Sequence, residues 1–388
     1  MAQIFRARGE AFRRSHVLKA YQTRAMWAVE RCRTEALGGH LDECASCGHF
    51  SIAYNSCRNR HCPKCQSLAQ AKWIEARLER ILPTHYFHVV FTLPGSLRPL
   101  ALRASEPLYD LLFSAASATL LELGRDPKRL GAQLGFTGVL HTWTRKLELH
   151  PHLHCVVTGG GLSLEGDRWI DVPGKDRFLF PVKVLSRLFR GKFVAGLARL
   201  FESGKLDLDP ADELECSVFE ALKRRLYDHE WNVYAKRPFK GAEHVYRYLG
   251  RYTHRVGLSN HRLREIAEET VTFATKDGGE VTLSHDVFLE RFLLHVLPPR
   301  FVKIRHYGLM ASSNATTKLE VARRFLEAQG ARSLEPPAEG GDWIDFYERL
   351  TGNDLRACPR CKGVVVRHSL RSPHALAVLA RAGKGPDP

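Results

Sequence analysis

Apolar residues spaced three or four positions apart recur in several stretches of this chain of 388 residues, and this periodicity predicts amphipathic or buried helices there. One of the helices is expected to end at Pro83, because proline cannot continue a helix. The helical stretches are 1–35, 67–81, 105–124, 183–204, 241–255 and 285–298.

Three segments rich in β-branched and aromatic residues predict strands instead. The first begins at His85 and is stopped by Pro94 and Gly95, and the other two, 136–143 and 150–158, are separated by a connection short enough for a hairpin. Strands and helices do not alternate as βαβ units, and there is no internal repeat. The pattern therefore predicts an α+β fold with an antiparallel sheet. The segment 44–65 has a loop-like pattern, and the chain beyond about 315 is expected to be irregular.

Composition narrows the class of protein. The chain has 58 Lys and Arg against 42 Asp and Glu, a net charge of +16, which favours a polyanionic partner, with nucleic acid ahead of a membrane surface. The first residues contain no apolar signal region, and no run of about 18 apolar residues could span a membrane. We therefore expect a cytoplasmic protein whose cysteines are reduced.

Two Cys-x-x-Cys pairs, Cys44 with Cys47 and Cys62 with Cys65, are separated by 14 residues. Thiolates three residues apart can hold one side of a tetrahedral Zn²⁺, and a second pair completes the site. Cys57 and His61 lie in the same segment, and either could replace one ligand. Because four thiolates leave no open coordination position, the expected zinc is structural.

A third pair, Cys358 and Cys361, is a candidate for a second zinc site with His368 and His374. A lone pair is weaker evidence than two adjacent ones, so the binding of metal here stays open.

Basic residues accompany the first cysteine cluster. Arg58, Arg60 and Lys64 lie between or beside its cysteines, where they are expected to contact DNA phosphates.

His152 and His154 are separated by one residue on a predicted strand, so both imidazoles lie on the same face of the sheet and Leu153 faces the core. Two imidazoles are half of a divalent metal site. His141, on the preceding strand of the expected hairpin, is the candidate third ligand. Glu148 and His150 are closer in sequence, but they fall in the connection. By itself a His-x-His pair is more often an ordinary pair of strand residues.

Tyr248 and Tyr252 are four residues apart on a predicted helix and hence share one face, whereas Tyr246 projects elsewhere. Arginines surround the pair, and their charge would attract phosphate and favour the phenolate form of a nucleophilic tyrosine. They are Arg247, Arg251 and Arg255, which are also candidate DNA-binding residues. An aromatic stripe in the core is the alternative, but such a stripe rarely has so many arginines around it.

In this order, FTLP, HLH and Tyr-x-x-x-Tyr resemble the three motifs of the HUH endonuclease superfamily. The segments SCRNRHCPKCQ, LHTWTRKLELHPHLHCVVTGGG and YLGRYTHRVGLSNHRL resemble one branch, the two-tyrosine rolling-circle insertion-sequence transposases with an N-terminal zinc-binding domain. The resemblance covers about residues 10 to 310.

The resemblance implies a small zinc-ribbon-like domain ahead of an HUH nuclease sheet flanked by helices. His152 and His154 would bind Mg²⁺ or Mn²⁺, with His141 as the least certain ligand, and Tyr248 and Tyr252 would be the nucleophiles. Single-stranded DNA would be cut, leaving a 5′-phosphotyrosine link. The expected division is 1–84 zinc-binding and DNA-recognition domain, 85–310 catalytic domain and 311–388 C-terminal region.

Three alternatives remain at this stage. A plasmid replication initiator or a relaxase would use the same chemistry, although it would not explain the N-terminal zinc module. A zinc-containing DNA-binding regulator without catalysis would explain the charge and the cysteines, but not the paired histidines together with the paired tyrosines. A zinc hydrolase is disfavoured because the chain lacks a His-Glu-x-x-His motif.

Overall fold

The structure is a computed structural model, and it divides into two compact units that interleave along the chain. The expected division into three consecutive segments stays a prediction. The described residues are 1–173, 178–208, 211, 213–236, 238, 250, 257–275, 277–332 and 341–370. The first unit comprises Met1–Trp73, His254–Val296 and Pro337–Pro388, and the second comprises Ile74–Thr253 and Leu297–Pro336.

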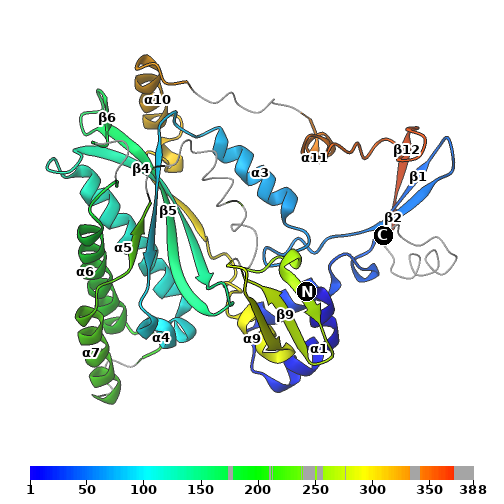
Figure 1. The fold of residues 1–388 in the computed structure, drawn as a ribbon, viewed down its shortest axis with the longest axis horizontal. Coiled ribbons are helices and arrows are strands. Elements are labelled where there is room, and N and C mark those ends of the chain that lie inside the picture. The colour runs from blue at the N-terminus through cyan, green and yellow to red at the C-terminus, as the bar shows by residue number, and fades with distance from the viewer. Residues whose placement is uncertain are drawn as a thin grey trace. The chain divides into compact units, whose positions relative to one another are not determined.

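An antiparallel sheet forms the centre of the second unit (Figure 1). Its strand order is β11-β4-β5-β3-β7, and β6 pairs with the far end of β5. The long hairpin of β4 and β5 dominates the sheet, as the sequence predicted. The strands are β3 (Tyr86–Thr92), β4 (Ala132–Trp143), β5 (Leu149–Ser163), β6 (Trp169–Asp171), β7 (Val233–Ala235) and β11 (Ile304–Gly308).

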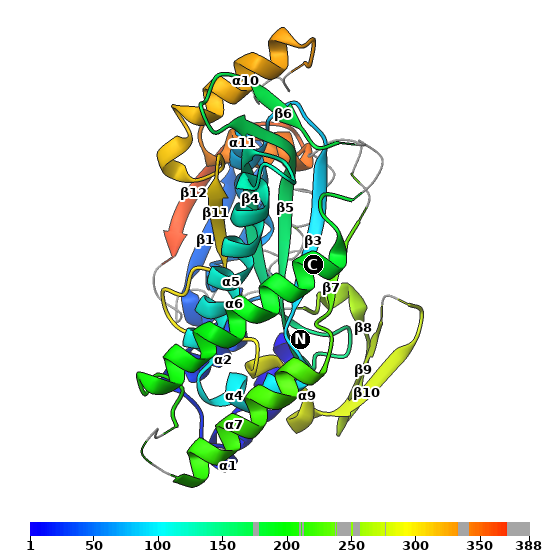
Figure 2. The same cartoon turned by 90° about the vertical axis from the view of Figure 1, so that its left-hand side faces the viewer.

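Helices cover one face of this sheet (Figure 2). The ring of Phe91 on β3 packs 4.8 Å from that of Phe189 on α6, and Gly138 on β4 lies against Phe113 of α5 and Leu153 of β5. Side chains alternate along a strand, so the neighbours of these apolar residues point to the opposite face. Among its described residues, this unit contains α4 (Arg98–Arg103), α5 (Ser105–Arg125), α6 (Val182–Glu202), α7 (Glu213–Asp228) and α10 (Lys318–Ala328).

The first unit has its own core of helices and a small antiparallel sheet, of order β10-β9-β8. The rings of Phe5 on α1 and Phe292 on α9 meet edge to face at 5.2 Å, and Phe273 of β9 is fully buried beside Phe288. These elements are α1 (Ala2–Ser15), α2 (Ala20–Arg31), β8 (Leu263–Ile266), β9 (Thr270–Ala274), β10 (Glu280–Ser284) and α9 (His285–Leu293).

A second small sheet in the first unit joins two distant parts of the chain, in the order β12-β1-β2 (Figure 1). Its elements are β1 (Gly39–Cys44), β2 (Phe50–Tyr54) and β12 (Val365–Leu370), with α11 (Trp343–Thr351) preceding β12. The helix α3 (Ser67–Leu78) crosses the boundary between the units. Short 3₁₀ helices occupy Glu35–Leu37, Gly95–Leu97, Asn260–Arg262 and Ser312–Asn314.

The predicted α+β class is confirmed, because every strand pairing among the described residues is antiparallel and the helices pack around the sheets. The helices expected at 67–81, 105–124 and 183–204 are present within a few residues. No helix in the described part of the chain is long and apolar enough to cross a membrane.

Several local expectations are corrected. The N-terminal stretch is two helices separated by a break before Ala20, and the helix that begins at His285 ends at Leu293 instead of 298. The segment 44–65 contributes to a hairpin, and the described residues beyond 315 include α10, α11 and β12, where an irregular chain was expected. The helix predicted at 241–255 lies outside the described residues, apart from Gly250.

Candidate active site and cysteine clusters

Three neighbouring strands place histidines on the sheet face opposite α5 and α6. His141 on β4 is paired directly with His152 on β5, and His154 follows two residues later on the same face. The hairpin register thus brings His141 beside the pair, as the sequence predicted. We call the face that carries His88, His141, His152 and His154 the histidine face.

The three predicted ligands form a compact group. One ring nitrogen from each of His141, His152 and His154 can be chosen so that all lie within 4.8 Å of one another. The ring centroids of His141 and His154 are 4.2 Å apart, and those of His152 and His154 are 4.9 Å apart. Glu148 and His150 are not members of this group. The arrangement can hold one metal ion through three nitrogens on one side, leaving its other side for further ligands.

Contacts behind the ligands set their orientation. Nδ1 of His152 lies 2.7 Å from the carbonyl oxygen of His150, so it donates its proton there and leaves Nε2 as the nitrogen with a lone pair. Nδ1 of His154 lies 2.8 Å from Nε2 of His88 on β3. A metal-binding histidine commonly engages its second ring nitrogen in this way.

His88 is the residue that sequence reasoning missed. It pairs in register with Val156, and His154 pairs with Val90, so His88 and His154 are diagonal neighbours on one face. The sequence showed only which residues of the strand HYFHVVFTLP share a face with His88. It did not show the register of this strand with β5, which is needed to place His88 beside His154.

Burial favours the neutral form of His88, His141 and His152. His88, His141 and His154 are each less than a tenth exposed. Burial lowers the pKa of His88 and of His152 to about 4, and it lowers the pKa of His141 well below 6.5, helped by the neighbouring histidines. Because the neutral ring is the form that ligates a metal, the site is ready to bind at neutral pH.

The donor set also discriminates between the two ions expected from the sequence. Imidazole nitrogen is accepted more readily by first-row transition metals than by Mg²⁺, which prefers oxygen ligands. Three histidines therefore fit Mn²⁺ better than Mg²⁺.

The predicted nucleophiles Tyr248 and Tyr252 lie outside the described residues, as do the three arginines Arg247, Arg251 and Arg255, and their roles stay predictions.

Eight of the ten cysteines form two clusters. Neither cluster is the group of Cys44, Cys47, Cys62 and Cys65 that the sequence predicted. The first cluster is Cys32, Cys57, Cys62 and Cys65, and the second is Cys44, Cys47, Cys358 and Cys361. In each cluster the four sulfur atoms lie within 4.8 Å of one another. Of the two histidines named as candidates beside the C-terminal pair, His368 is not a member of the second cluster, and His374 lies outside the described residues.

The β1–β2 hairpin explains the grouping. Cys44 and Cys47 lie at its tip, whereas Cys57, Cys62 and Cys65 follow the opposite end of β2. Five strand residues extend about 17 Å, far more than the few ångströms between sulfurs on one zinc. The two Cys-x-x-Cys pairs therefore cannot share an ion, and Cys32, beside the base of the hairpin, completes the first cluster.

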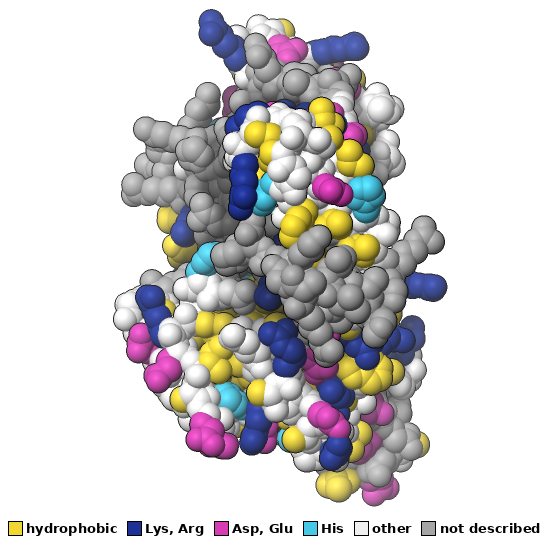
Figure 3. Space-filling model, turned by 90° about the vertical axis from the view of Figure 1, so that its right-hand side faces the viewer, with side chains coloured by type: hydrophobic (Ala, Val, Ile, Leu, Met, Phe, Trp, Pro, Cys, Tyr) yellow, Lys and Arg dark blue, Asp and Glu magenta, His cyan; other side chains and the backbone are white. Residues whose placement is uncertain are grey.

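The candidate DNA-binding residues near the first cluster differ in exposure. Arg58, in a left-handed conformation with φ of 52°, and Lys64 are exposed, whereas burial lowers the pKa of the partly buried Arg60. On the face drawn in Figure 3, the described Lys and Arg side chains are scattered among acidic and apolar ones and do not gather in one patch. The role of these three residues in DNA binding stays a prediction.

Comparison with known proteins provides the family. A family model described as "Putative transposase" matches residues 135–317, and one described as "Transposase zinc-binding domain" matches residues 4–93. The chain is 48% identical over 373 residues to "Putative transposase y4qJ" of Sinorhizobium fredii, which covers 93% of this chain and 92% of the relative. It is 30% identical over 295 residues to "Transposase for insertion sequence element IS801" of Pseudomonas savastanoi pv. phaseolicola, over 72% and 68% of the two chains.

This chain belongs to the IS91-type transposase family. As a transposase it acts on DNA, which fits its net charge of +16. The match to the transposase region contains the three clustered histidines and also Tyr248 and Tyr252. The match to the zinc-binding domain contains the whole first cysteine cluster, which supports structural Zn²⁺ in this transposase.

Proposed function

We propose that this transposase cuts single-stranded DNA with a tyrosine nucleophile, becomes covalently attached to the 5′ end and then transfers that strand. The observation that carries the proposal is the group formed by His141, His152 and His154 on the histidine face. The expected nucleophiles, Tyr248 and Tyr252, rest on their sequence pattern and on the resemblance of that pattern to two-tyrosine transposases.

His141, His152 and His154 would hold the divalent ion, with Mn²⁺ a better match than Mg²⁺. Such an ion, when bound, offsets the charge of a non-bridging phosphate oxygen and polarises the phosphorus. The His150 carbonyl contacts Nδ1 of His152, and His88 contacts Nδ1 of His154, so Nε2 of each ring would be the atom that holds the ion. The buried surroundings of His141 and His154 exclude water and strengthen the interaction of the site with an anionic substrate.

In the proposed reaction, the phenolate oxygen of Tyr248 or Tyr252 forms a bond to phosphorus, and the bond from phosphorus to the 3′ oxygen breaks. The leaving oxygen takes up a proton and departs as a free 3′-hydroxyl. The ordinary pKa of tyrosine is about 10, so the arginines near both tyrosines would assist by stabilising the phenolate.

The phosphotyrosine link retains a phosphoester, so a 3′-hydroxyl of another strand can displace the tyrosine and join the strands without ATP. Two tyrosines would allow one to hold the first end while the other cuts again. The substrate is expected to be single-stranded, because a tyrosine must reach an exposed backbone phosphate.

The test is a denaturing gel of transposase incubated with Mn²⁺ and single-stranded DNA from the flanks of its coding region, labelled at the 3′ end. Wild type should give a labelled protein adduct, and Tyr248→Phe combined with Tyr252→Phe should give none. Tyr227→Phe, at an exposed position of α7, is the matched control and should retain the adduct. An adduct that persists in the double variant, or depends equally on Tyr227, would refute the proposal.

A second arm addresses the histidines. His152→Ala should abolish the adduct with Mn²⁺ while leaving DNA binding intact, because the ion acts on the reacting phosphate. Adduct formation by this variant at the wild-type rate would exclude the histidine group from the reaction.

A further inference from the structure

The second cysteine cluster joins two short loops of the same construction. In the first loop the N–H of Cys44 donates to the carbonyl of His49 at 2.7 Å, and the N–H of Gly48 donates to the carbonyl of Cys44 at 3.1 Å. Gly48 has a left-handed φ of 68°. The loop places Cys44 and Cys47 side by side at the tip of the β1–β2 hairpin.

The C-terminal loop repeats this pattern more than 300 residues later. The N–H of Cys358 donates to the carbonyl of Gly363 at 2.8 Å, and the N–H of Lys362 donates to the carbonyl of Cys358 at 2.9 Å. Lys362 occupies the position of Gly48 and has a φ of 61°, which is rare for a residue with a side chain. A strained backbone conformation persists where the surrounding structure imposes it. A metal ion held by both loops would impose this one.

The four sulfur atoms have the spacing that a tetrahedral zinc requires. Sγ of Cys44 lies 3.4 Å from Sγ of Cys361, and Sγ of Cys47 lies 3.8 Å from Sγ of Cys358. With zinc–sulfur bonds of about 2.3 Å, tetrahedral geometry places sulfurs about 3.8 Å apart. A disulfide would require about 2 Å, so the arrangement matches a metal site better than a pair of disulfides.

Backbone N–H groups point at one sulfur in each loop. Those of Cys47 and Ser46 point at the sulfur of Cys44, and those of Cys361 and Arg360 point at the sulfur of Cys358. The two loops therefore surround their first cysteine in the same way.

The strands next to the cysteines hold the two loops in register. β12 pairs with β1 from Gly39 opposite Leu370 to Cys44 opposite Val365, and the N–H of Ala45 donates to the carbonyl of Val364 at 3.1 Å. The guanidinium of Arg367 makes a bidentate ion pair with Asp42, at 2.6 and 2.7 Å.

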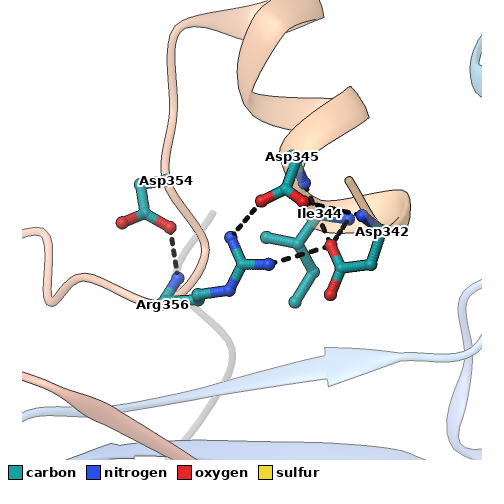
Figure 4. A network of polar contacts seen from close by, with 5 residues as sticks. All are labelled: Asp342, Ile344, Asp345, Asp354 and Arg356. Atoms are coloured by element: carbon teal, nitrogen blue, oxygen red, sulfur yellow. Dashed lines mark hydrogen bonds and ion pairs between the residues drawn. The ribbon is translucent and has the colours of Figure 1, made fainter. Parts of the chain in front are cut away.

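A network of polar contacts connects the C-terminal loop with the helix that precedes it (Figure 4). Asp342 caps α11, and Arg356 bridges the helix N-terminus by donating to Asp345 at 2.7 Å and to Asp342 at 2.9 Å. Arg356 is two residues before Cys358, so the network connects α11 with the cysteine loop. The segment 341–370 thus docks on the hairpin as one piece.

We propose that Cys44, Cys47, Cys358 and Cys361 form a second structural zinc site, one half of which comes from the C-terminal segment. The match to the transposase zinc-binding domain ends at residue 93, so the site extends zinc binding to a part of the chain beyond that domain. Four thiolates close the coordination sphere, and the ion fastens 341–370 to the N-terminal hairpin.

Metal analysis of the purified full-length transposase tests the site. Wild type should contain about two zinc ions per chain, and Cys358→Ser combined with Cys361→Ser should contain one fewer. Cys216→Ser changes a partly buried cysteine that belongs to neither cluster, and it should leave the zinc content unchanged. Cys361→His, in a chain that keeps Cys358, should retain both zinc ions, because histidine is also a zinc ligand.

Limited proteolysis provides a readout that does not depend on metal counting. In the double serine variant, cleavage within 341–370 should become at least about tenfold faster, while the remaining zinc shows that the first cluster is still folded. The proposal is overturned if the double variant keeps the zinc content of wild type, or if thiol titration of the native protein finds these four cysteines paired in disulfides.

Discussion

Replacing His88 by Leu should weaken metal binding by His141, His152 and His154, although His88 is not one of the expected ligands. In the wild type, Nε2 of His88 lies 2.8 Å from Nδ1 of His154. When Nε2 of His154 binds an ion, its Nδ1 carries the proton and donates it to His88, which fixes both the tautomer and the ring angle. Leucine fills a similar volume but accepts no hydrogen bond.

The expected loss follows from two estimates. Removing the partner that orients a metal ligand typically lowers metal affinity about 10- to 100-fold, equivalent to about 1.4–2.8 kcal/mol. A neutral hydrogen bond contributes about 1 kcal/mol by itself, so a loss nearer the upper value would indicate that the orientation of the ring matters beyond the bond.

Mn²⁺ titration followed by electron paramagnetic resonance measures the affinity directly. His88→Gln should recover most of it, because the amide oxygen can accept the proton of His154. His306→Leu is the matched control. His306 lies on the same sheet face and is hydrogen-bonded to Thr137 and Arg77. Thr137 is about 13 Å along β4 from His141. If His88→Leu binds Mn²⁺ within twofold of wild type, or no more weakly than His306→Leu, the orienting role of His88 is wrong.

Three further outcomes are expected. Between pH 7.5 and 5.5, protonation of His152 should lower the Mn²⁺ affinity less than about twofold, because its pKa of about 4 keeps the ring neutral in that range. A ligand with the ordinary pKa of 6.5 would lose about tenfold in affinity. The same Mn²⁺ titration at both pH values distinguishes the two cases. Gly161→Ala should lower the midpoint of thermal unfolding, because a Cβ there would lie 2.6 Å from the carbonyl oxygen of Gln133 on β4, and an unchanged midpoint would contradict the close packing of the hairpin. Gly191→Ala, inside α6 with open space around the Cβ position, should instead stabilise the protein by about 1 kcal/mol, and thermal unfolding that shifts downward would show that the position is crowded.

Local periodicity was sufficient for part of the active-site prediction. The two-residue repeat of a strand is a property of the backbone, so His152 and His154 had to share a face wherever the strand lay. The short connection between the predicted strands implied a hairpin, and its register brought His141 opposite His152. The candidate third ligand could therefore be chosen from the sequence, although its distance from the pair could not.

Pairings between distant segments depended on the tertiary structure. His88 joined the site only through the register of β3 on β5, which no spacing within the chain specifies. The cysteines were grouped incorrectly for the same reason: spacing favours neighbours in sequence, whereas the rigid hairpin separates Cys44 from Cys62 and β12 brings Cys358 to it.

The sequence by itself thus determined the α+β class, the two-residue and helical repeats and the residue types suited to metal binding, because these follow from the geometry of one backbone segment. Only the tertiary structure decided which cysteines share an ion and which histidine supports the ligands. Those contacts arise from strand registers and loop closures across hundreds of residues, and their free energy depends on the packing of the whole unit.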